Sequence, residues 1–162
     1  LKRIREEKRK KEVEASQKNR KFSTMKGKLP WPVEGSIIKN SGIDDKDGVK
    51  ERNLFVEIKT KKGENVKVVF DGIVADIDYN PIYNTYIIID HGDGYATLYA
   101  NLDDSSIEVL SQTYIESGAI IGNTLNNFDN KKNNSYGLLY FGILRTKDNQ
   151  EVKPYNPREW IR

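Results

Sequence analysis

Residues 87–102 read IIIDHGDGYATLYANL, and this stretch decides the fold class. Apolar and aromatic side chains dominate residues 85–90 (TYIIID) and 95–99 (YATLY), which is the composition of β-strands. Between them, His91-Gly92-Asp93-Gly94 supplies two glycines, which adopt positive φ without steric cost. The stretch therefore predicts a β-hairpin with a four-residue loop, and it places His91 in the turn.

Short strands separated by turn residues continue on both sides of this hairpin. Residues 66–70 (VKVVF) and 72–77 (GIVADI) predict a second hairpin, joined at the turn dipeptide Asp71-Gly72. Residues 138–144 (LLYFGIL) form a continuous apolar run, which is typical of a strand buried on both faces. We also predict short strands at 107–109, 113–115 and 119–122, a polar loop at 126–135, and a terminal turn capped by Asn156 and begun by Pro157. This pattern indicates an all-β fold, an antiparallel β-sandwich or half-barrel.

The N-terminal part of the chain has a different composition. Residues 1–21 hold ten Lys or Arg, four Glu and no Gly or Pro, and predict a charged helix, either the end of a coiled coil or a regulatory arm. Since this pattern is already present at residue 1, we expect the chain to be a fragment of a longer protein. Residues 22–32 contain three Gly or Pro residues and predict a hinge, with Leu29 and Trp31 as apolar anchors. Residues 33–162 are predicted to form the β domain.

Composition and charge exclude several classes of protein. No apolar run approaches the roughly 18 residues of a membrane span, and the absence of cysteine excludes disulfides and thiolate metal sites. The net charge of +3 combines +6 in residues 1–21 with −3 in the remainder. A basic leader could contact nucleic acid, anionic lipid or an acidic partner, and a solvated helix is the simpler interpretation. The acidic β domain has no stripe of interleaved aromatic and Arg residues, which argues against nucleic acid.

Five stretches, in order and with their spacing, carry a resemblance to a known family. They are KGKLPWPVEGSI at 26–37, KKGENVKVVFDGIV at 61–74, IIIDHGDGYATLYANL at 87–102, LLYFGI at 138–143 and NPREWI at 156–161. From residue 25 onward the chain resembles the lysostaphin-type (LytM-like) zinc endopeptidase domain, and in particular the EnvC-type murein hydrolase activators. The resemblance implies a LytM-like fold, preceded by the charged helix.

The resemblance also implies which positions would hold the metal. Active members bind zinc through a His-x-x-x-Asp pair and the second histidine of a His-x-His strand, and a histidine in a Tyr-Ala-His-Leu stretch assists catalysis. The corresponding positions here are Asn53 and Glu57, Leu138 and Tyr140, and Asn101. Amide, alkyl and phenol groups are poor zinc ligands, and one carboxylate does not hold the ion. We therefore expect a degenerate domain with no zinc, no cofactor and no catalytic residues.

We expect these positions to form a groove that binds a partner, although ordinary sheet surface is the alternative. The predicted binding residues are Asn53, Glu57, Tyr99, Asn101, Leu138 and Tyr140, with tyrosines 79, 83, 86, 95 and 136 as further candidates for the walls. For His91 the alternatives are a hairpin-turn residue and a lone general base, and the turn residue is favoured because no nucleophile set accompanies it.

The resemblance implies a function at the bacterial cell wall, outside the cytoplasm and in the periplasm. A non-catalytic domain of this kind activates an N-acetylmuramoyl-L-alanine amidase, which cuts peptidoglycan during cell division. Its helical region connects to a division-site membrane complex of the FtsEX type. Two alternatives stay open: a metallo-endopeptidase of peptidoglycan with an atypical zinc site, and a non-enzymatic wall-binding or scaffold module.

Overall fold

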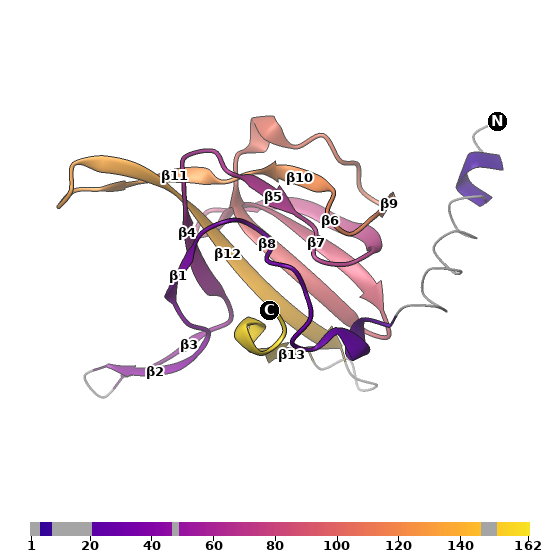
Figure 1. Ribbon diagram of the computed structural model, residues 1–162, viewed down its shortest axis with the longest axis horizontal. Coiled ribbons are helices and arrows are strands. Elements are labelled where there is room, and N and C mark those ends of the chain that lie inside the picture. The colour runs from indigo at the N-terminus through magenta and orange to yellow at the C-terminus, as the bar shows by residue number, and fades with distance from the viewer. Residues whose placement is uncertain (1–3, 8–20, 47–48, 147–151) are drawn as a thin grey trace.

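A computed structural model describes residues 4–7, 21–46, 49–146 and 152–162. Within these residues a nine-stranded antiparallel sheet forms the body of the molecule, accompanied by the two-stranded sheets β5–β10 and β2–β3 (Figure 1). The large sheet has the order β1-β4-β12-β8-β7-β6-β9, and β11 and β13 also pair with β12. The predicted all-β class is confirmed. Residues 4–7 are helical, and residues 8–20 of the predicted leader helix lie outside the described residues.

The bounds of the elements are as follows. The strands are β1 (Ser36–Lys39), β2 (Gly42–Lys46), β3 (Val49–Asn53), β4 (Val56–Thr60), β5 (Asn65–Lys67), β6 (Gly72–Asn80), β7 (Asn84–Gly92), β8 (Tyr95–Leu102), β9 (Tyr114–Ile115), β10 (Ile120–Asn123), β11 (Leu125–Asp129), β12 (Asn134–Thr146) and β13 (Val152–Tyr155). Three short 3₁₀ turns are η1 (Phe22–Met25), η2 (Asp104–Ser106) and η3 (Pro157–Glu159).

The core lies between one face of the large sheet and the small sheet β5–β10. Successive side chains of a strand point to opposite faces, and the alternate positions of β4, β7, β8 and β12 are fully buried. Val66 of β5 and Ile121 of β10 cover this face. Burying one such aliphatic or aromatic side chain contributes about 1.5–3 kcal/mol. The buried positions of the large sheet are Val56, Ile58, Ile87, Ile89, Tyr99, Leu139, Phe141 and Ile143.

The hairpin predicted from residues 85–99 is confirmed, with a shorter turn. Gly92 pairs with Tyr95, so the loop consists of Asp93 and Gly94, with φ of 52° and 80°. Positive φ at both central residues matches the right-handed twist of the flanking strands. His91 consequently lies within β7 and not in the turn, and its predicted turn position is wrong.

The second predicted hairpin is wrong. β5 ends at Lys67 and pairs with β10, whereas β6 begins at Gly72 and pairs with β7 and β9. Gly72 does not need positive φ; it is required because a Cβ there would lie 2.4 Å from the carbonyl oxygen of Asp90. The glycine at this position therefore permits close approach of two strands, a requirement that resembles a turn signal in the sequence.

The bounds of several other predicted elements differ from those in the structure. Residues 126–135 are not a loop, because β11 pairs with β12 from Leu125↔Leu138 to Asp129↔Asn134. Residues 107–109 form no strand, whereas those at 113–115 and 119–122 correspond to β9 and β10. The strand predicted at 138–144 is confirmed as the middle of β12.

Residues 22–32, predicted as a hinge, pack on the β domain. Phe22 and Leu29 are buried, and Leu29 forms a parallel bridge with Ile161, exchanging backbone hydrogen bonds with residues 160 and 162. Trp31 donates from Nε1 to the carbonyl oxygen of Arg162 at 2.7 Å. The predicted anchors are therefore in contact with the C-terminal turn. Whether this segment acts as a hinge stays a prediction.

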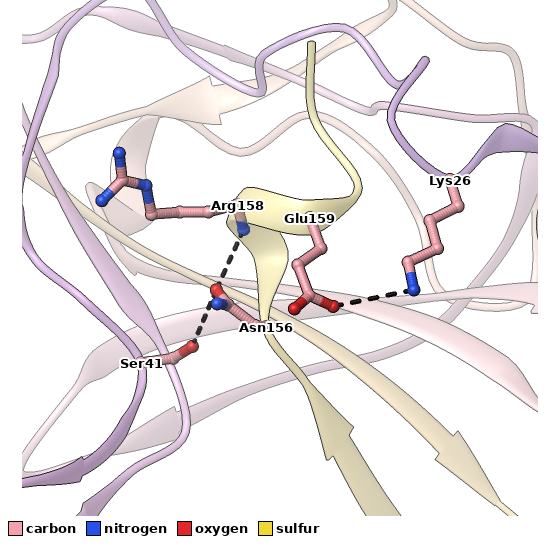
Figure 2. Close-up of polar contacts among 5 residues, drawn as sticks. All are labelled: Lys26, Ser41, Asn156, Arg158 and Glu159. Carbon is pink, nitrogen blue, oxygen red and sulfur yellow. Dashed lines mark hydrogen bonds and ion pairs between the residues drawn. The ribbon is translucent and has the colours of Figure 1, made fainter.

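The C-terminal turn η3 forms as predicted. The Asn156 side chain accepts a hydrogen bond from the backbone N–H of Arg158 at 3.1 Å, and Pro157 begins the turn (Figure 2). Ser41, which follows β1, donates to the same Asn156 oxygen at 3.3 Å (Figure 2). The cap thus joins the end of the chain to the first strand. Among the described residues, no helix is long and apolar enough to cross a membrane.

The close approach at Gly72 yields a stability prediction. Gly72→Ala should lower the free energy of unfolding by about 2 kcal/mol or more, because the new methyl group meets a backbone atom that cannot move alone. Gly122→Ala is the matched control, since its new Cβ would meet only the side chains of Ile107 and Ser106 at 3.3 Å. Urea unfolding of both variants measures the difference. Equal destabilisation would contradict the assigned role of Gly72.

Candidate functional site

Glu57 and Tyr140 lie side by side on the face of the large sheet opposite the core. The two residues are direct partners in the β4–β12 pairing, and Tyr140 is also opposite Ala100 of β8. Their neighbours along each strand, such as Val56 and Phe141, are buried in the core, so alternation turns Glu57 and Tyr140 outward. The structure therefore brings together two of the predicted groove residues.

An aromatic cluster covers this face beside Tyr140. The Tyr83 ring meets Tyr140 edge-on at 5.4 Å between centroids, and it meets Phe55 in the same manner at 5.1 Å. Phe55 packs directly on Gly142 of β12, where a Cβ would be 2.7 Å from its Cδ1 atom. Edge-to-face pairs contribute about 0.5–1.5 kcal/mol beyond their buried area. Tyr83 was a predicted wall residue, whereas Phe55 was missed because its contact partner Gly142 lies 87 positions later in the sequence.

The electrostatics of the face combine a carboxylate with a neutral phenol. Burial raises the pKa of Tyr140, and the negative charge of Glu57 raises it further, so the hydroxyl keeps its proton. The Glu57 side chain is 18% exposed, and its Oε2 lies 3.9 Å from Nζ of Lys39, which is a long and partly exposed ion pair. Lys59 stands 4.8 Å from the ring centre of Tyr136. The face can therefore offer an acceptor, a hydroxyl donor and aromatic edges to a partner.

Asn101, which the sequence resemblance aligns with an assisting histidine, directs its side-chain hydrogen bonds into the fold. Its side chain is buried, and its backbone φ is 67°, a left-handed conformation that Asn tolerates well. Nδ2 donates to the carbonyl oxygens of Leu138 at 2.7 Å and Leu125 at 3.3 Å, while Oδ1 accepts from Asn84 at 2.8 Å. Asn101 thus connects β8 to β11, β12 and the β6–β7 turn, and it stabilises the face from below.

Not all of the predicted groove residues are accessible. Tyr99 is fully buried on the core side of β8, so its assignment to the groove is wrong, and the reason is strand alternation. Asn101 and Leu138 are each 2% exposed. Asn53 lies in the small sheet β2–β3 and donates to the carbonyl oxygen of Asn40 at 3.2 Å. The predicted residues that remain accessible are therefore Glu57 and Tyr140 on the large sheet and Asn53 on the separate β2–β3 sheet.

The donor set of this face does not fit zinc. Glu57 supplies one carboxylate, the phenol of Tyr140 keeps its proton, and the Asn101 amide oxygen already accepts a hydrogen bond. A catalytic zinc needs three protein ligands with an open position. Within the part of the chain that the structure describes, no cluster of three His, Cys, Asp or Glu side chains is placed to hold a metal ion.

The single histidine lies in the core beneath the N-terminal segment. His91 is 3% exposed, and the Phe22 ring stacks on it at 4.8 Å between centroids. Its Nδ1 lies 2.9 Å from the carbonyl oxygen of Asp71, and its Nε2 lies 2.7 Å from the hydroxyl of Thr97. Burial lowers the pKa of His91 to about 4. The ring is therefore neutral at pH 7, and its enclosure contradicts the alternative of a general base.

Because the His91 ring is neutral, only one of its two nitrogens carries a proton, and this decides which of them donates a hydrogen bond. With one ring proton, Nδ1–H donates to the carbonyl of Asp71, and Nε2 accepts from Thr97 Oγ1. The Thr97 oxygen lies 2.9 Å from the Tyr99 hydroxyl, and this hydroxyl also accepts a hydrogen bond from the backbone N–H of Val69. Every polar atom in this buried chain of hydrogen bonds has a partner, as buried polar groups require. Tyr99 thus has a structural role in the core.

The fold is that of a LytM-like β domain, and the sheet face opposite its core carries aromatic, amide and carboxylate groups. The model of peptidase family M23 matches residues 53–154. The chain belongs to this family.

Two curated relatives come from cell division and wall metabolism. The chain is 30% identical over 98 residues to the cell division protein DipM of Caulobacter vibrioides, a match that covers 60% of this chain and 15% of DipM. It is 24% identical over 139 residues to the murein hydrolase activator EnvC of Escherichia coli, covering 84% of this chain and 29% of EnvC. The chain therefore spans less than a third of the length of either relative.

Solved structures share the fold at low identity. Helicobacter pylori Csd3 superposes with a TM-score of 0.66 and 21% identity, over 85% of this chain and 35% of Csd3. A chain of the SpoIIQ–SpoIIIAH pore-forming complex superposes with a TM-score of 0.62 and 17% identity, over 85% of this chain and 92% of that chain.

The buried histidine predicts a pH dependence of stability. The folded-state pKa of about 4 lies below the ordinary value of 6.5, so the unfolded chain binds the proton first as the pH falls. Stability is fully present above about pH 6.5 and decreases toward pH 4, by about 3 kcal/mol in total. Urea unfolding at several pH values between 7 and 5 measures this slope, in a range where ordinary carboxylates contribute little.

His91→Asn supplies the control for this prediction. An Asn side chain does not titrate and still carries an N–H donor for the Asp71 carbonyl. The variant should be less stable at pH 7 and should show a flatter dependence between pH 6.5 and 5. A slope equal to that of the unmodified chain would show that other groups cause it.

Proposed function

We propose that this chain is a non-catalytic M23 domain that activates a peptidoglycan amidase during cell division. The observation that carries the proposal is the face around Glu57 and Tyr140. By the sequence resemblance, this face corresponds to the active site of the family. Its donor set does not fit zinc, and it presents polar and aromatic groups outward. Family membership and the similarity to EnvC, a murein hydrolase activator, also support this proposal.

The proposed mechanism is a shift between two states of the amidase. An activator increases the active population only if it binds the open amidase more tightly than the closed one. We propose that the segment blocking the amidase active site docks against Glu57, Tyr140 and Tyr83. A basic side chain of that segment would replace the long Lys39–Glu57 contact, and an apolar side chain would pack on the aromatic edges.

The same proposal includes location and upstream partners. An amidase that cuts peptidoglycan acts outside the cytoplasm, so we place this domain in the periplasm or an equivalent compartment of a bacterium. The N-terminal helical region would connect it to a division-site membrane complex of the FtsEX type. Since Phe22 is anchored on His91 and Trp160 by ring stacking at 4.8 and 5.0 Å, the point where such a region joins the domain is fixed.

Two other functions remain as competitors in the experiment. A metallo-endopeptidase would need donors that this face does not offer, and stoichiometric zinc with chelator-sensitive cleavage of peptidoglycan peptides would support it. A wall-binding or scaffold module would bind sacculi without stimulating any amidase.

The deciding experiment is release of dye from labelled peptidoglycan by a cognate amidase, with and without this chain. The chain should stimulate release and should release nothing by itself. Glu57→Lys and Tyr140→Ala should each reduce the stimulation by about tenfold, because each removes a central contact of the proposed docking face.

The controls separate docking from folding. Glu116→Lys introduces the same charge reversal at an exposed residue that does not belong to the docking face, and it should leave stimulation unchanged. Tyr140→Phe keeps the ring and removes only the hydroxyl, so it should have an intermediate effect. No stimulation at excess of the unmodified chain would refute the proposal.

A further inference from the structure

Trp31 stands between two hollows that Glu57 and Tyr140 do not line. The side chain is 37% exposed, which is unusual for Trp in a packed domain, and its Nε1–H donates to the Arg162 carbonyl. That hydrogen bond fixes the ring and satisfies its polar atom. Trp31 and Gly35 line both hollows, so the indole forms a common wall.

The first hollow, of about 540 Å³, is positively charged. It lies between β1 and the C-terminal turn, where Ser36 and Ile37 face Arg158 and Arg162. Figure 2 shows Glu159 turned toward Lys26, with which it forms an ion pair at 3.7 Å, while Arg158 extends to the other side.

The guanidinium of Arg158 has spare capacity. Its Nη1 donates to Oδ1 of Asn40 at 2.9 Å, and a guanidinium has five N–H donors. Among the described residues, neither Arg158 nor Arg162 forms an ion pair with a carboxylate. Two arginines beside an aromatic ring suit a carboxylate that is attached to an apolar group.

The second hollow, of about 440 Å³, is lined by acidic residues. Among the described residues, its wall includes Val33, Glu34, Glu64 and Asn65, together with the cation Lys67. Glu64 Oε1 accepts from the backbone N–H of Asn65 at 3.3 Å and keeps its remaining acceptor capacity. This hollow suits an amine or amide donor. Opposite charges therefore meet across one aromatic wall.

We propose that Trp31 and its two hollows form a second binding site, which takes a short zwitterionic peptide. The carboxylate pairs with Arg158 and Arg162, the aliphatic part lies on Trp31, and the amine reaches Glu34 and Glu64. Both volumes fall within the range of about 300–1,000 Å³ that is usual for small-ligand sites. The stem peptides of murein have this chemistry. The site is independent of amidase docking at Glu57 and Tyr140.

The test is titration of the whole chain with the free tetrapeptide L-alanyl-γ-D-glutamyl-meso-diaminopimelyl-D-alanine. Calorimetry gives the Kd, and tryptophan fluorescence reports the location, because Trp31 is partly exposed and Trp160 is buried. Arg158→Gln should raise the Kd at least about tenfold, and Arg158→Lys should have a smaller effect since it keeps the charge. Trp31→Phe should remove most of the fluorescence change while binding persists in calorimetry.

Controls assign the result to this site. Lys131→Gln removes an exposed charge in the β11–β12 turn and should leave the Kd unchanged. Chitotetraose, an uncharged glycan, should not bind. An all-L peptide Ala-Glu-Lys-Ala that binds equally well would support recognition by charge placement alone, and weaker binding would support selection of the wall peptide. Arg158→Gln should retain amidase stimulation.

Three outcomes would overturn the proposal. They are no saturable binding up to about 5 mM tetrapeptide, an unchanged Kd in an Arg158→Gln variant with the thermal midpoint of the unmodified chain, and chitotetraose binding as tightly as the peptide.

Discussion

Strand β12 is the element on which the rest of the structure depends. It pairs with β4 along one edge and β8 along the other, and its two ends extend to β11 and β13 (Figure 1). Two glycines let other groups approach its backbone. A Cβ at Gly137 would lie 2.2 Å from the Thr60 hydroxyl, and one at Gly142 would lie 2.7 Å from Phe55. A side chain at Gly137 would push against Thr60 of β4, and one at Gly142 would displace the Phe55 ring, so the packing of both faces depends on these two residues.

One face of β12 packs in the core, and the other carries the residues of the proposed docking face. Leu139, Phe141 and Ile143 bury the core face, while Tyr140 presents a protonated phenol beside Glu57 on the other. Glu57 and Tyr140 therefore lie on a face whose side chains the core does not use, so changes of residue type at these positions are compatible with the fold. Asn101 stabilises this face through hydrogen bonds of its own.

Local sequence patterns predicted the elements whose cause is local. The β7–β8 hairpin follows from alternating apolar residues around Asp93-Gly94, and the terminal turn follows from Asn156-Pro157. The prediction of a hairpin at Asp71-Gly72 was wrong because the glycine allows the backbone to lie close to Asp90 of the neighbouring strand, and it does not form a turn. The prediction of a loop at 126–135 was wrong because a segment rich in polar residues forms a strand when β12 lies beside it and accepts its backbone hydrogen bonds.

The sequence by itself determined the all-β class and the resemblance to the M23 family, because each depends on residue identity and spacing. The tertiary structure alone decided that His91 and Tyr99 belong to one buried hydrogen-bonded chain, and that Glu57 and Tyr140 are the accessible pair. It also brought Trp31 beside Arg158, 127 positions later in the chain. The reason is register: the face on which a side chain emerges, and what it meets there, is set by strands distant in sequence.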